Sequence, residues 1–177
     1  AGTLNHDTPI VTTRPFRSPH HTVSTVALSG GGSVPRPGEV SLAHHGVLFL
    51  DEFPEFSTKA IESLRAPVED SKVTVSRASG TVEYPANFML VCAMNPCKCG
   101  YLGHPTKSCT CSASQIAKYN SRISGPMLDR IDIHVEVPAV KYTEMSSKVI
   151  GEKSSAIRER VIAARKIQFN KYKGTGI

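Results

Sequence analysis

The chain alternates between short apolar runs and polar loops. Two runs are continuous: residues 47–50 follow Gly46, and residues 88–94 end at Asn95. Continuous apolar runs of this length, bounded by turn residues, are typical of strands buried in a parallel sheet. Residues 131–137 alternate apolar and polar side chains instead. That alternation predicts a strand at a sheet edge or a strand with one exposed face.

Helices and a hairpin are predicted between and after these runs. Apolar residues recur at helical spacing over residues 57–69, and Ser57 is placed to cap the helix N-terminus. Residues 73–84 contain two β-branched arms that flank a turn with Gly80, which predicts a β-hairpin. A helical stripe of apolar side chains over residues 154–172 predicts a C-terminal helix.

The N-terminal part is less regular. Residues 1–33 are predicted to be irregular because their prolines exclude a continuous helix through the first part. The glycines from Gly30 to Gly32 suit a flexible loop better than a phosphate cradle, because no lysine follows at the spacing of G-x₄-G-K-S/T. That motif occurs nowhere in the chain. Residues 34–43 indicate a turn and a short strand that leads toward the first buried run.

Composition bounds the class of protein without deciding it. The 177 residues fit one globular domain with a second small subdomain. Lys and Arg number 21 against 15 acidic residues, and the net charge of +6 is compatible with nucleic acid, although the charge is not segregated. No run approaches the roughly 18 apolar residues of a membrane helix, and no signal peptide opens the chain. We therefore expect a cytoplasmic protein with no membrane partner.

Asp51 and Glu52 directly follow the first buried run. Ligands of open α/β sheets bind beyond the carboxyl ends of the strands. An acidic pair there suits a site in which one carboxylate holds Mg²⁺ and its neighbour orients or activates water. The alternative is a strand that ends in an acidic turn. Asn95 and Arg130 supply a polar group and a cation beside the other two predicted strands, as phosphoryl transfer from ATP to water requires.

Four cysteines form a C-x-C-x₉-C-x-C pattern: Cys97, Cys99, Cys109 and Cys111. Two close pairs joined by a glycine- and proline-containing loop can converge on one tetrahedral Zn²⁺, and His104 in the loop is a spare donor. Disulfides are disfavoured because nothing else indicates an oxidising compartment. Reduced structural cysteines remain the alternative. Cys92 lies within an apolar run and is predicted to be a small buried core residue.

Two histidine pairs invite a metal hypothesis: His20 with His21, and His44 with His45. Neither pair has carboxylates at the spacing that metal ligands require. Polar loop residues, or residues that support a neighbouring site, are therefore favoured over metal ligands.

Several longer motifs occur in one order along the chain: residues 14–21, residues 37–44 leading into 50–52, residues 94–97, and residues 124–132. With these motifs, the chain resembles the AAA+ module of the magnesium-chelatase-like ATPases over nearly all of its length. The resemblance is to the bacterial competence-associated group called ComM or YifB. It implies an α/β fold: a partial AAA+ parallel-sheet core over residues 1–140 with β-hairpin insertions and a Cys-rich loop. Residues 141–177 would begin a C-terminal helical lid.

The resemblance also implies roles for single residues. Asp51 and Glu52 would form the Walker B site for Mg²⁺ and ATP, with Glu52 catalytic, and Asn95 would be sensor 1. Arg130 would be an arginine finger that acts across a subunit boundary in a ring, expected to be a hexamer. Arg122 is a weaker candidate for a second trans-acting arginine.

Two insertions resemble those of replicative helicases of the MCM type. Residues 73–84 resemble the pre-sensor-1 hairpin, and residues 34–42 resemble the helix-2 insertion. In such ring motors the hairpins point into the pore. Arg77, near the hairpin tip, is therefore a candidate for contacts with DNA phosphates, which position a strand without reading its sequence.

The family's P-loop is expected upstream of Ala1, and its sensor 2 arginine beyond Ile177. The resemblance thus implies an ATP hydrolase for the intact protein and an inactive piece in this chain. The favoured function is an ATP-driven DNA motor of the helicase or branch-migration type. One alternative is a motor subunit of a metal-chelatase complex. The other, for this chain alone, is a non-catalytic zinc- or DNA-binding module.

Overall fold

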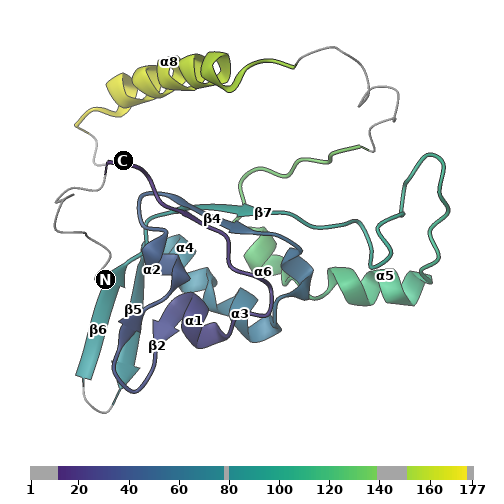
Figure 1. Ribbon diagram of the computed structural model, residues 1–177, viewed down its shortest axis with the longest axis horizontal. Helices are drawn as coiled ribbons and strands as arrows, with labels where there is room; N and C mark the ends of the chain where they lie inside the picture. Colours follow the sequence, from purple (N-terminus) through teal and green to yellow (C-terminus); the bar gives the residue numbers. More distant parts are fainter. Residues whose placement is uncertain (1–11, 78–79, 139–150, 175–177) are drawn as a thin grey trace. The chain divides into compact units, whose positions relative to one another are not determined.

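The computed structural model describes residues 12–77, 80–138 and 151–174 of the chain (Figure 1). The chain divides into two units, Ala1–Pro138 and Ala139–Ile177, and each is described by itself. The predicted boundary between core and lid, at residues 140 and 141, lies outside the described residues.

A three-stranded parallel sheet forms the centre of the first unit. Its strands are β1 (Phe16–Arg17), β4 (Val47–Leu50) and β7 (Met89–Cys92), in the order β1-β4-β7. The predicted strands at residues 47–50 and 88–94 are therefore confirmed, and they pair in parallel from Val47 opposite Met89 to Leu50 opposite Cys92.

The two faces of this sheet differ in burial. Leu48 and Leu50 are fully buried on the face that the helices cover. On the other face, Met89 is 64% exposed and Val91 is 37% exposed, so the prediction that this second run is buried on both faces is wrong. In the part of the chain that the structure describes, helices such as α1 (Thr25–Ser29), α3 (Thr58–Ser63) and α6 (Gly125–Leu128) lie on one side of β4 and β7 (Figure 1).

The N-terminal part is more regular than its prolines predict. Beyond β1 it contains α1 (Thr25–Ser29), which begins after Ser24, whose Oγ accepts the Ala27 N–H at 3.1 Å. Residues 1–11 of the predicted irregular stretch lie outside the described residues. The prolines precede α1, so they do not interrupt it.

The first two glycines of this run form a strand rather than a flexible loop, and Gly32 lies in the turn that follows. β2 (Gly30–Gly31) pairs antiparallel with β3 (Arg36–Pro37). Gly30 has φ of +99°, and a Cβ there would meet the Arg36 carbonyl oxygen at 2.8 Å. Glycine is required at this position because the partner backbone approaches so closely.

The predicted short strand within residues 34–43 is only partly correct. β3 ends at Pro37, and α2 (Glu39–Leu42) follows Gly38. Val40 and Ala43 are both fully buried. Their spacing of three residues is that of a helix face, so burial of both side chains favours a helical turn over an extended one.

The helix predicted for residues 57–69 is capped as expected. Ser57 Oγ accepts the Ala60 N–H at 3.2 Å, and α3 (Thr58–Ser63) begins at the next residue. The helix is not continuous, however, because Leu64 separates α3 from α4 (Arg65–Asp70). Pro67 explains the break: it has no N–H to donate to the carbonyl of Ser63, and its ring disfavours a regular turn there.

The predicted hairpin is confirmed as β5 (Lys72–Arg77) and β6 (Gly80–Pro85), which pair antiparallel. Val73 and Val75 of β5 are buried against the core, and Lys72 Nζ lies 2.9 Å from Glu83 Oε1 across the pair. The remaining elements of the core are a 3₁₀ turn at Phe53–Glu55, α5 (Ala113–Asn120) and α6 (Gly125–Leu128).

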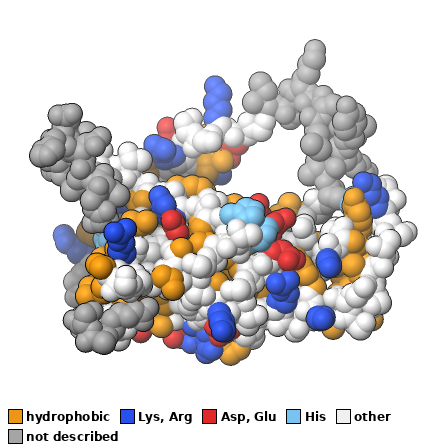
Figure 2. Space-filling view, turned by 60° about the horizontal axis from the view of Figure 1, so that its bottom comes forward, with side chains coloured by type: hydrophobic (Ala, Val, Ile, Leu, Met, Phe, Trp, Pro, Cys, Tyr) orange, Lys and Arg blue, Asp and Glu red, His pale blue; other side chains and the backbone are white. Residues whose placement is uncertain are grey.

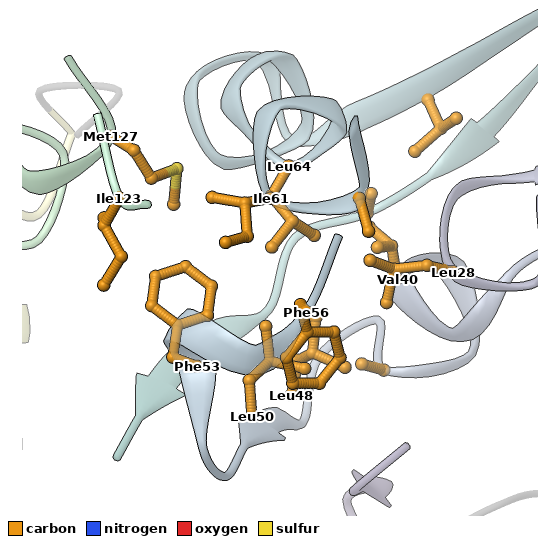
Figure 3. Close-up of a cluster of buried hydrophobic side chains, with 14 of the residues drawn as sticks. Leu28, Val40, Leu48, Leu50, Phe53, Phe56, Ile61, Leu64, Ile123 and Met127 are labelled. Atoms are coloured by element: carbon orange, nitrogen blue, oxygen red, sulfur yellow. The ribbon is translucent and has the colours of Figure 1, made fainter. Parts of the chain in front are cut away.

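One buried cluster holds these elements together. Its members come from the sheet, from α1 to α3 and from the region of α6; those labelled in Figure 3 are Leu28, Val40, Leu48, Leu50, Phe53, Phe56, Ile61, Leu64, Ile123 and Met127. Phe53 directly follows the acidic pair and Phe56 lies three residues further on, and their ring centroids lie 6.4 Å apart. The acidic turn is therefore anchored to the core by the aromatic residues that follow it.

The strand predicted at residues 131–137 is wrong. These residues form no strand, and Ile133, Val135 and Val137 are 76%, 74% and 81% exposed. Alternation marks a surface suited to a sheet, but a strand also needs a partner for its backbone groups. Among the described residues, no strand pairs with this segment.

The second unit contains α8 (Ser154–Tyr172), which confirms the predicted C-terminal helix. No side chain of α8 is buried, and Ile157, Val161 and Ile167 of its predicted apolar stripe are all exposed. None of the helices in the described ranges has the length and apolarity that crossing a membrane would require.

Replacing Gly46 by alanine is expected to destabilise the chain by roughly 1–3 kcal/mol, because a Cβ there would meet the Pro15 carbonyl oxygen at 1.9 Å. Gly125→Ala is the matched control, since a Cβ at Gly125 meets nothing within 4 Å. Urea unfolding followed by circular dichroism measures both. Equal free energies of unfolding for the two variants would contradict the close approach of β1 to β4.

Candidate functional site

The carboxyl ends of β4 and β7 are joined by hydrogen bonds that continue past both strands. The Ala93 N–H donates to the Leu50 carbonyl at 3.0 Å, and the Phe53 N–H donates to the Ala93 carbonyl at 2.9 Å. The acidic pair therefore leaves β4 at the same edge at which Asn95 follows β7. Both predicted groups lie where ligands of α/β sheets bind.

The two acidic residues have different local geometry. Asp51 Oδ1 accepts the Glu52 N–H at 2.8 Å, which fixes the Asp51 carboxylate against the turn. Glu52 has φ of 51° and ψ of 43°, in the left-handed region. Such backbone is costly for a residue with a side chain, and it occurs most often where a turn must aim a functional group. Both side chains are exposed.

The acidic pair lines an open pocket of about 240 Å³ with four residues from the segment after β1: Ser18, Pro19, His20 and His21. His21 Nδ1 lies 3.0 Å from Glu52 Oε2. Figure 2 shows histidine and acidic side chains gathered side by side on one face of the molecule. The pocket thus combines two carboxylates with imidazole groups, and carboxylate oxygens are ligands that Mg²⁺ accepts.

Asn95 is exposed at the rim of this edge. Its backbone hydrogen-bonds to the hydroxyl of Tyr119, a buried residue of α5. Burial, and next the charge of Glu55, raise the pKa of Tyr119, so the phenol is neutral at physiological pH. α5 itself begins with a capping box between Ser112 and Gln115. The loop that carries Asn95 is therefore supported by a capped helix.

The two arginines make contacts within this chain. Arg130 is ion-paired with Glu69, at the end of α4, and donates a hydrogen bond to the Pro126 carbonyl. Arg122 Nη1 lies 3.1 Å from Glu55 Oε2. In the described part of the chain, neither arginine contacts Asp51 or Glu52. A role for Arg130 across a subunit boundary stays a prediction.

The four predicted cysteines converge. Their sulfur atoms all lie within 4.8 Å of one another, with Cys97 3.4 Å from Cys99 and 3.7 Å from Cys109. None is in a disulfide. Four sulfurs placed about 2.3 Å from Zn²⁺ in a tetrahedron lie about 3.8 Å from one another, so the donor set fits this metal.

The electrostatics of the cluster also suit a cation. Backbone hydrogen bonds from Tyr101 and Thr110 lower the pKa of Cys99 to about 5. The pKa of Cys109 is instead raised to about 12, because burial and the neighbouring Cys99 and Cys97 disfavour a further thiolate. A divalent cation among the four sulfurs would offset the repulsion between thiolates. His104 lies outside the cluster because its Nδ1 accepts the N–H groups of Thr106 and Lys107, at 3.2 and 3.1 Å. It orders the loop.

The second histidine pair lies at the other end of β4. His44 Nδ1 accepts the Asn87 N–H at 3.0 Å, and the His45 N–H donates to the Asn87 carbonyl at 2.6 Å. Burial, and then the neighbouring His45, lower the pKa of His44. This pair joins the loops that enter β4 and β7, which confirms the prediction of polar loop residues.

The hairpin candidate Arg77 ends β5 opposite Gly80. Its side chain and residues 78–79 lie outside the described residues. The sequence left the roles of His20 and His21 open, and only the pairing of β1 with β4 places them at the acidic pair. The support that Tyr119 gives to the Asn95 loop was not predicted. Its helical spacing from Gln115 and Ile116 was the available signal that it lies on a helix.

Comparison with known proteins identifies the family. Residues 1–145 match the family described as magnesium chelatase, subunit ChlI. The chain belongs to the magnesium-chelatase ChlI family. It is thus a member of a family of AAA+ ATPases, which confirms the resemblance that its motifs indicated.

Two relatives that are similar to this chain come from bacteria. YifB of Escherichia coli (strain K12) is 47% identical over 160 residues, which cover 89% of this chain and 31% of YifB. Competence protein ComM of Haemophilus influenzae is 46% identical over 160 residues, again covering 89% of this chain and 31% of the relative. The chain therefore spans about a third of the length of these curated relatives.

One solved structure, NtrX from Brucella abortus in complex with ADP, is a more distant likeness. The TM-score is 0.48 with 17% sequence identity, over 71% of this chain and 25% of that chain. This likeness adds nothing to the family assignment.

The cysteine cluster predicts one bound zinc ion per chain. Elemental analysis of the purified chain is expected to find zinc in a one-to-one ratio, and the double variant Cys97→Ser with Cys109→Ser is expected to lose it, because each substitution removes one thiolate ligand. Cys92→Ala is the control, since Cys92 is half-buried in β7, its pKa is raised to about 12 by burial, and it lies outside the cluster. Metal-free wild-type chain would contradict the assignment.

Proposed function

We propose that the protein to which this chain belongs is an ATP-driven AAA+ motor that acts on DNA, of the helicase or branch-migration type. The observation that carries the proposal is the acidic pair at the joined carboxyl ends of β4 and β7, with Asn95 at the same edge. Membership in the magnesium-chelatase ChlI family supports ATP as the ligand.

The residues at this edge fit Mg²⁺ and the terminal phosphate of ATP. Asp51 Oδ1 is engaged by the Glu52 N–H, which leaves Oδ2 for the cation. Glu52 would accept the proton of the attacking water, as a general base. The side-chain N–H of Asn95 would donate a hydrogen bond to an oxygen of the terminal phosphate. Bound Mg²⁺ would supply neutralisation of the phosphate charge.

A motor of this kind needs a cation that stabilises charge developing on the terminal phosphate. We assign this role to Arg130, acting on the site of a neighbouring subunit in a ring expected to be a hexamer. In the single chain, Glu69 holds the Arg130 guanidinium beside α4. Assembly would exchange this ion pair for contact with the phosphate of the next subunit.

Two surfaces support DNA as the partner. The β5–β6 hairpin projects from the core and carries Arg77 at the end of β5 (Figure 1). The cysteine loop exposes Lys98 and Tyr101, and Lys107 Nζ lies 4.8 Å from the Tyr101 ring centroid. Lysines beside an exposed aromatic ring suit contacts with phosphates and stacked bases. The net charge of +6 agrees with such a partner.

The second candidate is a motor subunit of a metal-chelatase complex, which the description of the family favours. There, ATP hydrolysis would remodel a partner protein and not DNA. The four-cysteine cluster argues against this candidate, because a chelatase motor is not expected to need a rigid zinc loop. For the 177-residue chain alone, binding of zinc and DNA without catalysis is the corresponding proposal.

Glu52→Gln, made in the protein extended to the full length of its relatives, is expected to bind ATP but to hydrolyse it at least about 100-fold more slowly, because the group that activates water is lost. Asp70→Asn, an exposed carboxylate at the end of α4, is the matched control. A phosphate-release assay with and without branched DNA measures turnover. Unchanged turnover in Glu52→Gln would contradict the assigned base, and indifference to DNA would favour the chelatase candidate.

Arg77→Ala in the same extended protein is expected to weaken DNA binding to a similar extent whatever the DNA sequence. The slope of the logarithm of the binding constant against the logarithm of the salt concentration is expected to fall by about 1 for each chain that contacts DNA. Lys59→Ala, an exposed cation on α3, is the control. Fluorescence anisotropy at several salt concentrations measures the slope. An identical slope for wild type and Arg77→Ala would remove the hairpin from the DNA path.

A further inference from the structure

We infer that the cysteine loop, residues 97–111, binds an unpaired DNA strand: the ring of Tyr101 stacks with one of its bases, and Lys107 beside the ring contacts a phosphate. This inference deepens the proposed function and rests on it, because it names the form of DNA that this surface of the protein takes.

The backbone of the loop is fixed by the cysteine cluster. The Tyr101 N–H donates a hydrogen bond to the Cys99 sulfur, and the Leu102 N–H donates one to the Cys97 sulfur. The His104 N–H donates to the Tyr101 carbonyl at 3.1 Å, which closes a turn. The side chains of Tyr101 and Leu102 are nevertheless 38% and 41% exposed. A ring presented by an ordered loop loses little conformational entropy when a ligand binds it.

The centre of the Tyr101 ring is not covered by its two neighbours. The His104 ring is nearly perpendicular to it, at 87° with the centroids 5.6 Å apart, so these rings do not stack face to face. Lys107 Nζ lies 3.5 Å from the Tyr101 hydroxyl oxygen and 4.8 Å from the ring centroid. The ammonium group therefore lies toward the hydroxyl end of the ring. An exposed aromatic ring of this kind can stack with any base whose own face is free.

The charge around the loop suits a phosphate backbone. Residues 84–128 contain no Asp or Glu, although the charge of the whole chain is not segregated. Lys98 and Lys107 of the loop and Lys118 of α5 are all exposed. Within the described ranges, none of these three lysines is in an ion pair. Lysines without carboxylate partners are available to phosphates, and counterions released from the DNA favour such contacts.

An unpaired strand fits this surface better than a duplex does. In a duplex the faces of each base are covered by the neighbouring base pairs, and a protein must unstack or flip a base to reach them. A base in a single strand has a free face, and stacking with an aromatic side chain tolerates any sequence. Figure 1 shows the loop between β7 and α5 far from the β5–β6 hairpin, so it is a second DNA-binding surface.

Tyr101→Leu in the extended protein is expected to bind an oligothymidine of about 16 nucleotides roughly 5- to 100-fold more weakly, because the stacking contribution of the ring is lost. Tyr101→Phe is expected to keep the wild-type affinity, since the ring remains. For duplex DNA of the same length, Tyr101→Leu is expected to match the wild type within about twofold. Fluorescence anisotropy without nucleotide measures all three affinities.

Tyr172→Leu is the matched control. Tyr172 also has a lysine beside its ring, with Lys171 Nζ 5.4 Å from the centroid, but it lies on α8, outside the loop. Elemental analysis of Tyr101→Leu is expected to find the same zinc content as in the wild type. Wild-type affinity of Tyr101→Leu for oligothymidine would overturn the inference, as would equal losses for the single strand and the duplex.

A second readout reports stacking directly and remains decisive if Tyr101→Leu loses its zinc. This chain contains no tryptophan, so Tyr101→Trp introduces a single indole at the loop. Its fluorescence is expected to be quenched by oligothymidine, because a base stacks with the indole, whereas the fluorescence of Tyr172→Trp is expected to stay unchanged. Unquenched emission from Tyr101→Trp, or equal quenching in both variants, would contradict stacking at Tyr101.

These outcomes are distinct from a failure of the proposed function. Hydrolysis of ATP that branched DNA stimulates, together with normal single-strand binding by Tyr101→Leu, would remove the stacking role and leave the DNA motor standing. Hydrolysis that no DNA stimulates would instead overturn the proposed function itself.

Discussion

The pairing of β4 with its two parallel neighbours determines the geometry of the candidate site. On one side, the backbone hydrogen bonds between β4 and β7 continue through Ala93 to Phe53, so the loops beyond both strands start at one edge. On the other side, Gly46 has no Cβ, so the Pro15 carbonyl before β1 can lie where a Cβ of residue 46 would otherwise be. Because both pairings are parallel, three loops that are distant in sequence leave the sheet together.

The polar groups at this edge are arranged by the apolar residues behind them. Phe53 and Phe56 anchor the acidic turn in the core. The left-handed backbone of Glu52 persists because Leu50 before the turn and Phe53 after it are both buried. The same Phe56 supports the ring of His21. The cysteine loop is ordered differently. It has no apolar core of its own, and its four thiols and neighbouring backbone N–H groups order it instead.

The sequence predicted those elements whose signals are local. The run before Asp51, the Ser57 cap and the hairpin around Gly80 are each specified by a few adjacent residues, and each was confirmed. The strand at residues 131–137 was wrong because alternation describes one face and not the partner that a strand needs. Contacts between segments distant in sequence, such as His21 with Glu52, depend on the pairing of β1, whose two residues give no readable pattern.

The most direct test of the account is a crystal structure of the extended protein with Mg²⁺ and a non-hydrolysable ATP analogue. Mg²⁺ is expected about 2.1 Å from an Asp51 oxygen, or roughly 4 Å from it where one water bridges the two, with the terminal phosphate at the shared edge of β4 and β7. Glu52 should face a water in line with that phosphate. A nucleotide bound with its phosphates away from both Asp51 and Glu52 would contradict the central claim.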